Sequence, residues 1–277
     1  MKILSEVLKL SAKYLEDHKI SRARRDAEDL LAFVLNIKRI DLYMQFDRPL
    51  DEKELDAYRP LLKRKAQGEP VEYILGKVDF YHCVLHVTPD VLIPRQETEI
   101  LLDKICKTPD LGKVIWDVCC GPGTLGIALK KARPELDVTL SDISPKALAL
   151  AQKNAVLNQV EVNFLEGDLL FPFKGQKADV IICNPPYVSE AEYEELENEV
   201  KKEPRLALVA ENEGYAFYER LSKELPSYLN KGGKAFFEIG FAQGERIKSL
   251  FNSEIYKKKW VEKDFAGHDR FFFLEME

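Results

Sequence analysis

Apolar residues recur at helical spacing in three segments within the first 75 residues. They occupy residues 3–15, residues 27–35 after a predicted N-cap at Ser21, and residues 51–66. Side chains three and four positions apart share one face of a helix, so each segment predicts an amphipathic helix. We therefore expect residues 1–75 to form a small helical domain that docks a substrate.

The spacing of apolar residues changes from a helical to an extended pattern in residues 76–93. Val78, Phe80, Val84, Leu85 and Val87 give short extended runs, which are broken at residues 82–83 and end at residues 88–90. Two short runs of this kind with a break between them indicate a hairpin. We expect a β-hairpin linker over this segment.

Short apolar runs alternate with helical patterns in the rest of the chain. The predicted strands are residues 114–118, 138–140, 160–165, 178–183, 234–239, 256–263 and 270–274, and the main predicted helices are residues 124–131, 145–157 and 215–229. This order is typical of an α/β fold, a mostly parallel sheet covered on both faces by helices. The turn at residues 264–269 is too short for a parallel crossover, so the last strand is expected to be antiparallel. Residues 94–277 are thus predicted to form a Rossmann-like domain with a seven-stranded sheet.

Composition excludes several classes of protein. A chain with 45% hydrophobic and 32% charged residues can form a core, so it is not disordered throughout. Near the N-terminus the longest nearly uncharged apolar run, residues 30–35, is far shorter than the roughly 20 residues that a membrane-spanning helix needs. The first 13 residues mix Lys and Glu with Leu and contain no small-residue cleavage site, so we expect a cytoplasmic protein without a membrane partner.

The net charge and the cysteine spacing argue against two further kinds of site, for nucleic acid and for metal. The chain has 41 basic and 47 acidic residues, a net charge of −6, which argues against stable binding to nucleic acid. The five cysteines form no C-x-x-C pair, so we expect free thiols and no metal site.

Glycines and carboxylates gather where the predicted parallel strands end. Ligands of such sheets bind beyond the carboxyl ends of the strands. Asp117 ends the first strand, Asp142 ends the second, and Asp168 and Leu169 follow the third. The turn after the first strand consists of Cys119, Cys120, Gly121, Pro122 and Gly123. We expect this turn to bind a nucleoside cofactor, with Asp142 accepting both ribose hydroxyls and the Asp168 segment bordering the adenine.

Two cofactors fit this pattern. Gly121, Gly123 and Gly126 match the G-x-G-x-x-G spacing of NAD sites. However, Asp117 would repel a pyrophosphate, whereas it suits a ligand with a cationic amino-acid end. We therefore favour S-adenosyl-L-methionine, with NAD as the alternative.

The tetrapeptide Asn184-Pro185-Pro186-Tyr187 follows the fourth predicted strand. Proline fixes the backbone and has no N–H, so the Pro185 carbonyl is a rigid acceptor beside the Asn184 side-chain oxygen. Two such acceptors can hold the N–H bonds of a planar –NH₂ group while Tyr187 stacks against it. We expect all four residues to bind the substrate, and Asn184, Pro185 and Tyr187 to be catalytic, with Asn184 also touching the cofactor. Such a site aims the nitrogen at an activated methyl group and needs no catalytic histidine.

The turn and the tetrapeptide together resemble class I S-adenosylmethionine methyltransferases that act on amide or exocyclic nitrogens. Three further stretches are Gly-Glu-Pro-Val-Glu-Tyr-Ile-Leu-Gly at residues 68–76, Val-Leu-Ile-Pro-Arg-Gln-Glu-Thr-Glu at 91–99, and Glu-Pro-Arg-Leu-Ala-Leu at 203–208. With these, the chain resembles the release factor glutamine methyltransferases, the HemK/PrmC family, over nearly its whole length. The tetrapeptide is shared with nucleic acid methyltransferases, whereas residues 93–99 are much more specific.

This resemblance implies methylation of the glutamine in the Gly-Gly-Gln loop of class I peptide chain release factors, a function in translation termination. It also implies that residues 119–123 form the cofactor turn, that Asp142 holds the ribose, that Leu169 lies against the adenine and that Asn184 touches both ligands. Cys119 stands where the family usually has glycine. We expect its Cβ to be accommodated without a positive φ.

Two other functions remain open. A nucleic acid methyltransferase would flip a base against Tyr187 and would need a basic channel. A binding module would keep the fold without chemistry, which an intact Asn184 disfavours. Arg95 and Arg205 are as compatible with surface ion pairs as with a role at the site.

Overall fold

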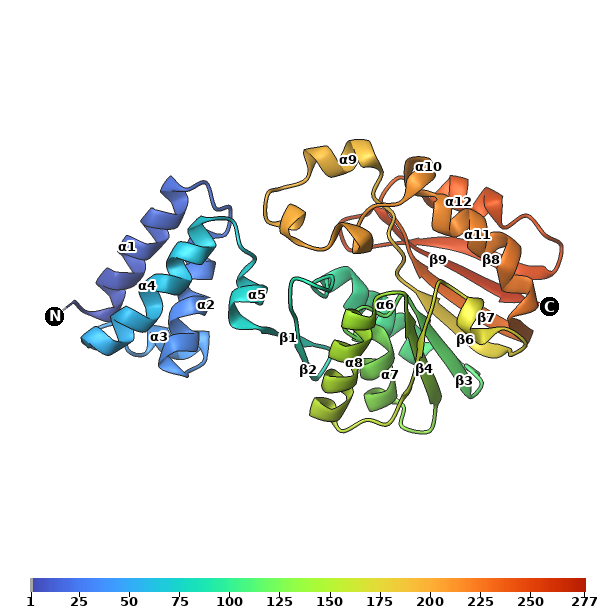
Figure 1. Ribbon diagram of the computed structural model, residues 1–277, viewed down its shortest axis with the longest axis horizontal. Coiled ribbons are helices and arrows are strands. Elements are labelled where there is room, and N and C mark those ends of the chain that lie inside the picture. Colours follow the sequence, from blue (N-terminus) through green and yellow to red (C-terminus); the bar gives the residue numbers. More distant parts are fainter. Residues whose placement is uncertain (1) are drawn as a thin grey trace. The chain divides into compact units, whose positions relative to one another are not determined.

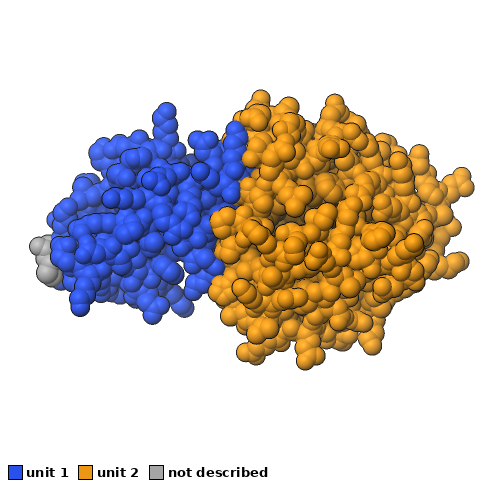
Figure 2. All heavy atoms as spheres, viewed as in Figure 1, with its two compact units in different colours: residues 1–77, 197–202 blue, residues 78–196, 203–277 orange. Residues whose placement is uncertain are grey.

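The computed structural model describes residues 2–277, and two compact units make up the chain (Figure 2). The first consists of Met1–Lys77 with Glu197–Lys202, and the second of Val78–Leu196 with Glu203–Glu277. The chain therefore leaves the second unit after Leu196 and returns to it at Glu203.

The first unit is helical. Its elements are α1 (Leu4–Asp17), α2 (Ala23–Leu35), α3 (Arg39–Tyr43), α4 (Glu52–Ala66) and α5 (Val71–Leu75). The three long helices match the three predicted segments, and their apolar faces bury Leu4, Leu30 and Leu31 completely. The predicted cap at Ser21 is wrong, because Arg22 precedes α2 and makes no side-chain cap. The short helices α3 and α5 have too few turns to show a helical period in the sequence.

A buried ion cluster lies inside this unit. The Lys65 side chain is fully buried, and its ammonium lies 3.0 Å from Asp26 Oδ2 and 2.6 Å from Glu199 Oε2. A charge without water needs a partner, so these contacts tie the 197–202 segment to α2 and α4.

The second unit contains a seven-stranded sheet of order β5-β4-β3-β6-β7-β9-β8 (Figure 1). Its strands are β3 (Val114–Val118), β4 (Asp137–Asp142), β5 (Asn163–Glu166), β6 (Ala178–Cys183), β7 (Leu229–Glu238), β8 (Tyr256–Lys263) and β9 (Asp269–Met276). The first five are parallel, and β9 is antiparallel to both of its neighbours, which confirms the prediction for the last strand. Ahead of the sheet, β1 (Lys77–Phe80) and β2 (Cys83–His86) pair as a separate two-stranded sheet.

Helices cover both faces of the large sheet (Figure 1). The helices α6 (Gln96–Lys107), α7 (Thr124–Ala132) and α8 (Pro145–Asn158) pack on one face, and α11 (Ala216–Glu224) and α12 (Gly244–Leu250) pack on the other. Adjacent residues of β3 separate the two cores, since Ile115 belongs to the first and Trp116 to the second. The central strands β3 and β6 are thus buried on both sides, as their continuous apolar sequences predict, whereas the edge strands β5 and β8 are largely exposed or half-buried. The short helices α9 (Glu190–Glu195) and α10 (Glu211–Gly214) lie in the connection between β6 and α11.

Some predicted boundaries are wrong. The helix expected over residues 215–229 is α11 followed by a 3₁₀ turn at Leu225–Ser227, because Pro226 cannot continue an α-helix. The fifth large-sheet strand, β7, begins at Leu229, five residues before the prediction. Within the described part of the chain, no helix is long and apolar enough to cross a membrane.

The sheet order determines where a ligand can bind. From β3 the chain goes to β4 on one side, and β6 later adds on the other side. The loops after β3 and β6 therefore diverge at the carboxyl edge of the sheet and leave a crevice between them.

Candidate functional site

The turn after β3 brings the backbone close to α7 and β4. A Cβ on Gly123 would lie 2.5 Å from Ile127 Cδ1, and one on Gly126 would lie 2.8 Å from Leu140 Cδ1. Gly123 also has a φ of +85°. Gly123 and Gly126 are therefore required here by the packing of the turn and helix, whatever the ligand, whereas a Cβ on Gly121 would meet no atom within 4 Å.

Cys119 differs from the prediction. It adopts a φ of +58°, whereas we expected its Cβ to be accommodated without a positive φ. The turn keeps its left-handed conformation and the cysteine bears the strain, which costs on the order of 1 kcal/mol. Its side chain lines the cavity described below, as does that of Cys120.

Asp117 is buried at the end of β3, with 1% of its surface exposed. Its Oδ2 accepts a hydrogen bond of 2.7 Å from the Gly126 N–H. Burial raises the pKa of Asp117 to about 7, while the Gly126 N–H lowers it and the neighbouring Asp142 raises it further. A carboxyl group with one fixed donor, buried beside a cavity, is a candidate partner for a cationic ligand group.

Asp142 ends β4 and is held by two backbone donors. Its Oδ2 accepts from the Gly121 N–H at 2.8 Å, and its Oδ1 accepts from the Ser144 N–H at 2.9 Å. Burial raises the pKa of Asp142, and the same two N–H groups lower it. Each oxygen keeps a further lone pair for a ligand hydroxyl. The next residue, Ile143, is half exposed on the cavity wall; the sequence did not single it out, although an Ile directly after this carboxylate was a usable signal.

Asn154 of α8 fixes the position of the turn. Its Nδ2 donates to the Pro122 carbonyl at 2.9 Å and to the His86 carbonyl at 3.1 Å, and its Oδ1 accepts from the His86 N–H at 2.7 Å. One buried amide thus joins β2 to the cofactor turn. Sequence patterns did not reveal it, because Asn154 lies inside an ordinary helical segment.

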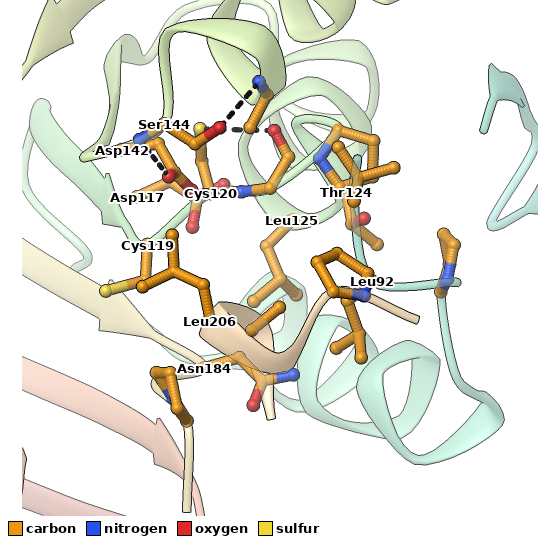
Figure 3. Close-up of a pocket in the computed structure, with 18 of the residues that line it drawn as sticks. Leu92, Asp117, Cys119, Cys120, Thr124, Leu125, Asp142, Ser144, Asn184 and Leu206 are labelled. Carbon is orange, nitrogen blue, oxygen red and sulfur yellow. Dashed lines mark hydrogen bonds between the residues drawn. The ribbon is translucent and has the colours of Figure 1, made fainter. Parts of the chain in front are cut away.

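The tetrapeptide lies directly across from this turn. In the parallel pairing of β3 and β6, Val118 lies opposite Cys183, so the chain segments that follow both strands emerge side by side. Asn184 and Pro186 line the same cavity as Asp117 and Asp142, and Figure 3 shows Asn184 on the far side of the cavity from Asp142. Pro185 is buried and Tyr187 is partly buried, and neither is part of the cavity lining.

The predicted adenine neighbours lie elsewhere. Asp168 forms a two-pronged ion pair with Arg220, with hydrogen bonds of 3.1 and 2.8 Å, and Leu169 packs in the core beneath β3 and β6. Neither residue lines this cavity. Their contact with adenine stays a prediction.

Two distant segments close the cavity wall. Glu203 is buried, its Oε2 accepts from the Ile93 N–H at 2.9 Å, and its Oε1 pairs with the Arg95 guanidinium. This places residues 204–207 against residues 90–95, and both segments contribute to the lining. Arg95 therefore lies at the site, whereas Arg205 pairs with Glu190 and both of those side chains are more than half exposed.

The charged side chains of the cavity lining are mainly carboxyl groups. Asp90, Asp117 and Asp142 line it; Asp90 is paired with Lys146 at 2.8 Å, and Arg95 is paired with Glu203. A pyrophosphate would meet carboxylates here, which weighs against the NAD alternative. In the part of the chain that the structure describes, no group of three or more His, Cys, Asp or Glu side chains could hold a metal ion.

Comparisons with known proteins agree with this geometry. The PrmC N-terminal domain family matches residues 6–76, and the methyltransferase small domain family matches residues 96–208. A methyltransferase structure from Pyrococcus furiosus is 18% identical, with a TM-score of 0.52 over 70% of this chain and 88% of that one, and it shows the shared fold.

Curated relatives extend over nearly the whole chain. A release factor glutamine methyltransferase from Chlamydia trachomatis serovar D is 42% identical over 98% of this chain and 94% of its own length. One of the same name from Geobacter sulfurreducens is 37% identical over 96% of this chain and 94% of its own. Identity at this level, on a chain that carries both the helical unit and the cavity with its tetrapeptide, is sufficient: the chain belongs to the release factor glutamine methyltransferase family.

Proposed function

We propose that this protein transfers a methyl group from S-adenosylmethionine to the side-chain amide of the glutamine in the Gly-Gly-Gln loop of class I peptide chain release factors. The reaction serves translation termination in the cytoplasm. Relatives with the matching name along almost the full chain support it. The observation that carries it is that Asn184 and Pro186 share one cavity with Asp117 and Asp142, so an amide site adjoins a nucleoside site.

The cavity fits the proposed cofactor. When bound, S-adenosylmethionine supplies an electrophilic methyl group on a positively charged sulfur. Asp142, fixed by the Gly121 and Ser144 N–H groups, accepts the ribose hydroxyls, and Ile143 lies against the adenine. Asp117 attracts the ammonium of the methionine end, and this interaction favours its ionised form.

The tetrapeptide positions the amide. Asn184 accepts one N–H bond through its side-chain oxygen, and the Pro185 carbonyl accepts the other. These acceptors would fix the orientation of the amide nitrogen, which lowers the entropy cost of bringing it to a bound methyl donor. They would also stabilise the positive charge that a transferred methyl group places on the amide. An N–H on such a charged amide is acidic enough to give its proton to water, so a strong base is not required.

The acidic cavity favours a protein substrate over a nucleic acid. Asp90, Asp117 and Asp142 line it and its arginine, Arg95, is paired with Glu203, whereas a nucleic acid methyltransferase needs cationic side chains along a phosphate backbone. A base-flipping enzyme remains the alternative that the experiment must exclude.

The test uses S-adenosylmethionine with a labelled methyl group, incubated with a class I release factor or with total nucleic acid. We expect label on the glutamine of the Gly-Gly-Gln loop, located by peptide mass. A release factor with that glutamine changed to alanine is the matched control and should stay unlabelled. Label that enters nucleic acid, or enters the control at the same rate, contradicts the proposal.

A further inference from the structure

A carboxyl group without a role in the proposed chemistry is buried behind the tetrapeptide. Glu238 is the last residue of β7, and only 1% of its surface is exposed. In the parallel pairing of β6 and β7, Cys183 lies opposite Phe237. Glu238 therefore stands beside the point where β6 passes into Asn184.

Glu238 receives hydrogen bonds from two separate elements. Its Oε1 accepts from the Tyr187 hydroxyl at 3.3 Å, and its Oε2 accepts from the Thr98 hydroxyl at 2.7 Å. Thr98 is a buried residue in the first turn of α6, and it also lines the cofactor cavity. One carboxylate thus connects the cavity wall with the aromatic residue of the amide site.

The backbone carbonyl of Tyr187 is also held by a hydrogen bond. Gln243 donates from its Nε2 to the Tyr187 carbonyl at 3.0 Å, and its Oε1 accepts from the Gly240 N–H at 2.9 Å. A Cβ on Gly214 would lie 2.3 Å from that carbonyl oxygen, so a glycine is required at position 214 for the carbonyl to keep this place. With its carbonyl held by Gln243, the remaining freedom of Tyr187 is the orientation of its side chain, which the Glu238 contact restricts.

The burial of Glu238 carries an energetic cost. Burial raises its pKa, and the Thr98 and Tyr187 hydroxyls and the nearby charge of Arg270 lower it, while Glu97 raises it. A carboxylate accepts at both oxygens, which makes the two hydroxyls donors and fixes the direction of each O–H bond. A protonated carboxyl or an amide could not accept both bonds in the same way. A glutamine at position 238 would therefore fill the same space but could not accept both of these hydrogen bonds.

We propose that Glu238 is a positioning residue that, through the Tyr187 hydroxyl, holds the aromatic face of the amide site against the bound glutamine side chain, and that Thr98 couples this arrangement to the cofactor cavity. The inference rests on the proposed function. It assigns Glu238 no contact with substrate or cofactor.

The experiment is a double-mutant cycle on the full chain with Glu238→Gln and Tyr187→Phe, measured as kcat and KM for release factor and as dissociation constant for the cofactor. Each single variant should lower kcat by about tenfold, the scale of one charge-assisted hydrogen bond, with the cofactor constant within about twofold of the wild type. The double variant should be no slower than the worse single variant, because both changes remove the same contact. Multiplicative losses, or losses confined to the cofactor constant, overturn the proposal.

Two comparisons separate positioning from folding. Thr98→Val should lower kcat while Thr98→Ser, which keeps the hydroxyl, recovers most of it; equal loss in both overturns the coupling through Thr98. Glu275→Gln, on β9 beside Lys257 at 3.6 Å, is the matched control and should leave kcat unchanged.

A urea-unfolding cycle on the same Glu238 and Tyr187 variants measures their coupling without any substrate. Non-additive stability with multiplicative kcat losses shows a contact that is only structural and overturns the proposal. If wild-type protein methylates no release factor, the proposed function fails instead, while the unfolding cycle still tests the Glu238–Tyr187 contact; additive stability would then overturn the inference by itself.

Discussion

Replacement of Asp117 by Asn tests the electrostatics of the cofactor turn. Asp117 is fully buried, and its pKa is raised from the ordinary value of 3.8 to about 7. The folded protein therefore holds a proton on Asp117 between pH 4 and pH 7 that the unfolded chain has released. Stability must fall as pH rises through this window. The difference between the two pKa values corresponds to about 4 kcal/mol of unfolding free energy, all of it lost once the pH exceeds about 7.

Asp117→Asn keeps an oxygen acceptor for the Gly126 N–H but cannot ionise. Its new amide donors add a constant cost that does not depend on pH. We therefore expect the wild type to lose up to about 4 kcal/mol relative to the variant between pH 4 and pH 8. Urea unfolding of both proteins across this range measures the difference, in which titrating groups that do not interact with Asp117 cancel. Asp168→Asn, at an exposed ion pair with Arg220, is the control and should show no such trend.

Cofactor binding should show the opposite dependence on pH. If Asp117 meets the ammonium of S-adenosylmethionine, its ionised form binds better, and the affinity of the wild type should rise by up to tenfold per pH unit as the pH increases from 5.5 to 7. The variant should bind more weakly and without this dependence, as measured by calorimetry. A stability difference that is independent of pH would falsify the assignment of a raised pKa, and equal pH profiles for binding would refute the contact with the ammonium.

Three further substitutions have expected outcomes. Asn184→Ala should lower kcat by about 10²–10³ with little change in cofactor affinity, because it removes one acceptor that acts in the transition state, and turnover at the wild-type rate would disprove its role. Asn154→Ala should destabilise the protein by at least about 2 kcal/mol in urea and weaken cofactor binding, since it removes the hydrogen bonds that join the turn after β3 to β2; unaltered binding would show that the turn keeps its conformation without Asn154. Lys65→Met should cost about 3 kcal/mol because buried Asp26 loses the ammonium at 3.0 Å and keeps the Arg22 guanidinium, half exposed and 3.9 Å away, and a second change, Asp26→Leu, should restore most of the loss; a failure to recover would contradict the ion-pair account.

The fold was largely predictable because its signals are local. Strand and helix periods predicted the seven strands of the sheet, and the short turn before β9 predicted that strand's direction. The predicted elements were wrong where contacts with neighbouring elements, and not the local pattern of residues, decide the structure. The helix before β7 ends early at a 3₁₀ turn, and α3 and α5 are single short segments whose helicity depends on packing in the first unit.

The site was predictable in part for the same reason. The turn, Asp142 and Asn184 lie at the ends of strands, and parallel strands bring their ends to one edge. Asp168 follows the same rule in sequence, yet Arg220 pairs with it and it does not reach the cavity lining. Cys119 keeps a positive φ that its residue type disfavours, because the path of the turn is set by the contacts of Gly123 and Gly126 around it.

By itself, the sequence determined which elements form, which strands are buried on both faces, and which chemistry-bearing residues stand at strand ends, because each of these depends on a few consecutive residues. Only the tertiary structure decided the partners of buried polar groups. Glu203 meets Arg95 across 108 positions, Glu238 meets Thr98 across 140, and Asn154 meets His86 across 68. No local pattern encodes such pairs. They arise because a buried polar group must find a partner from whatever distant segment the packed sheet and helices bring beside it.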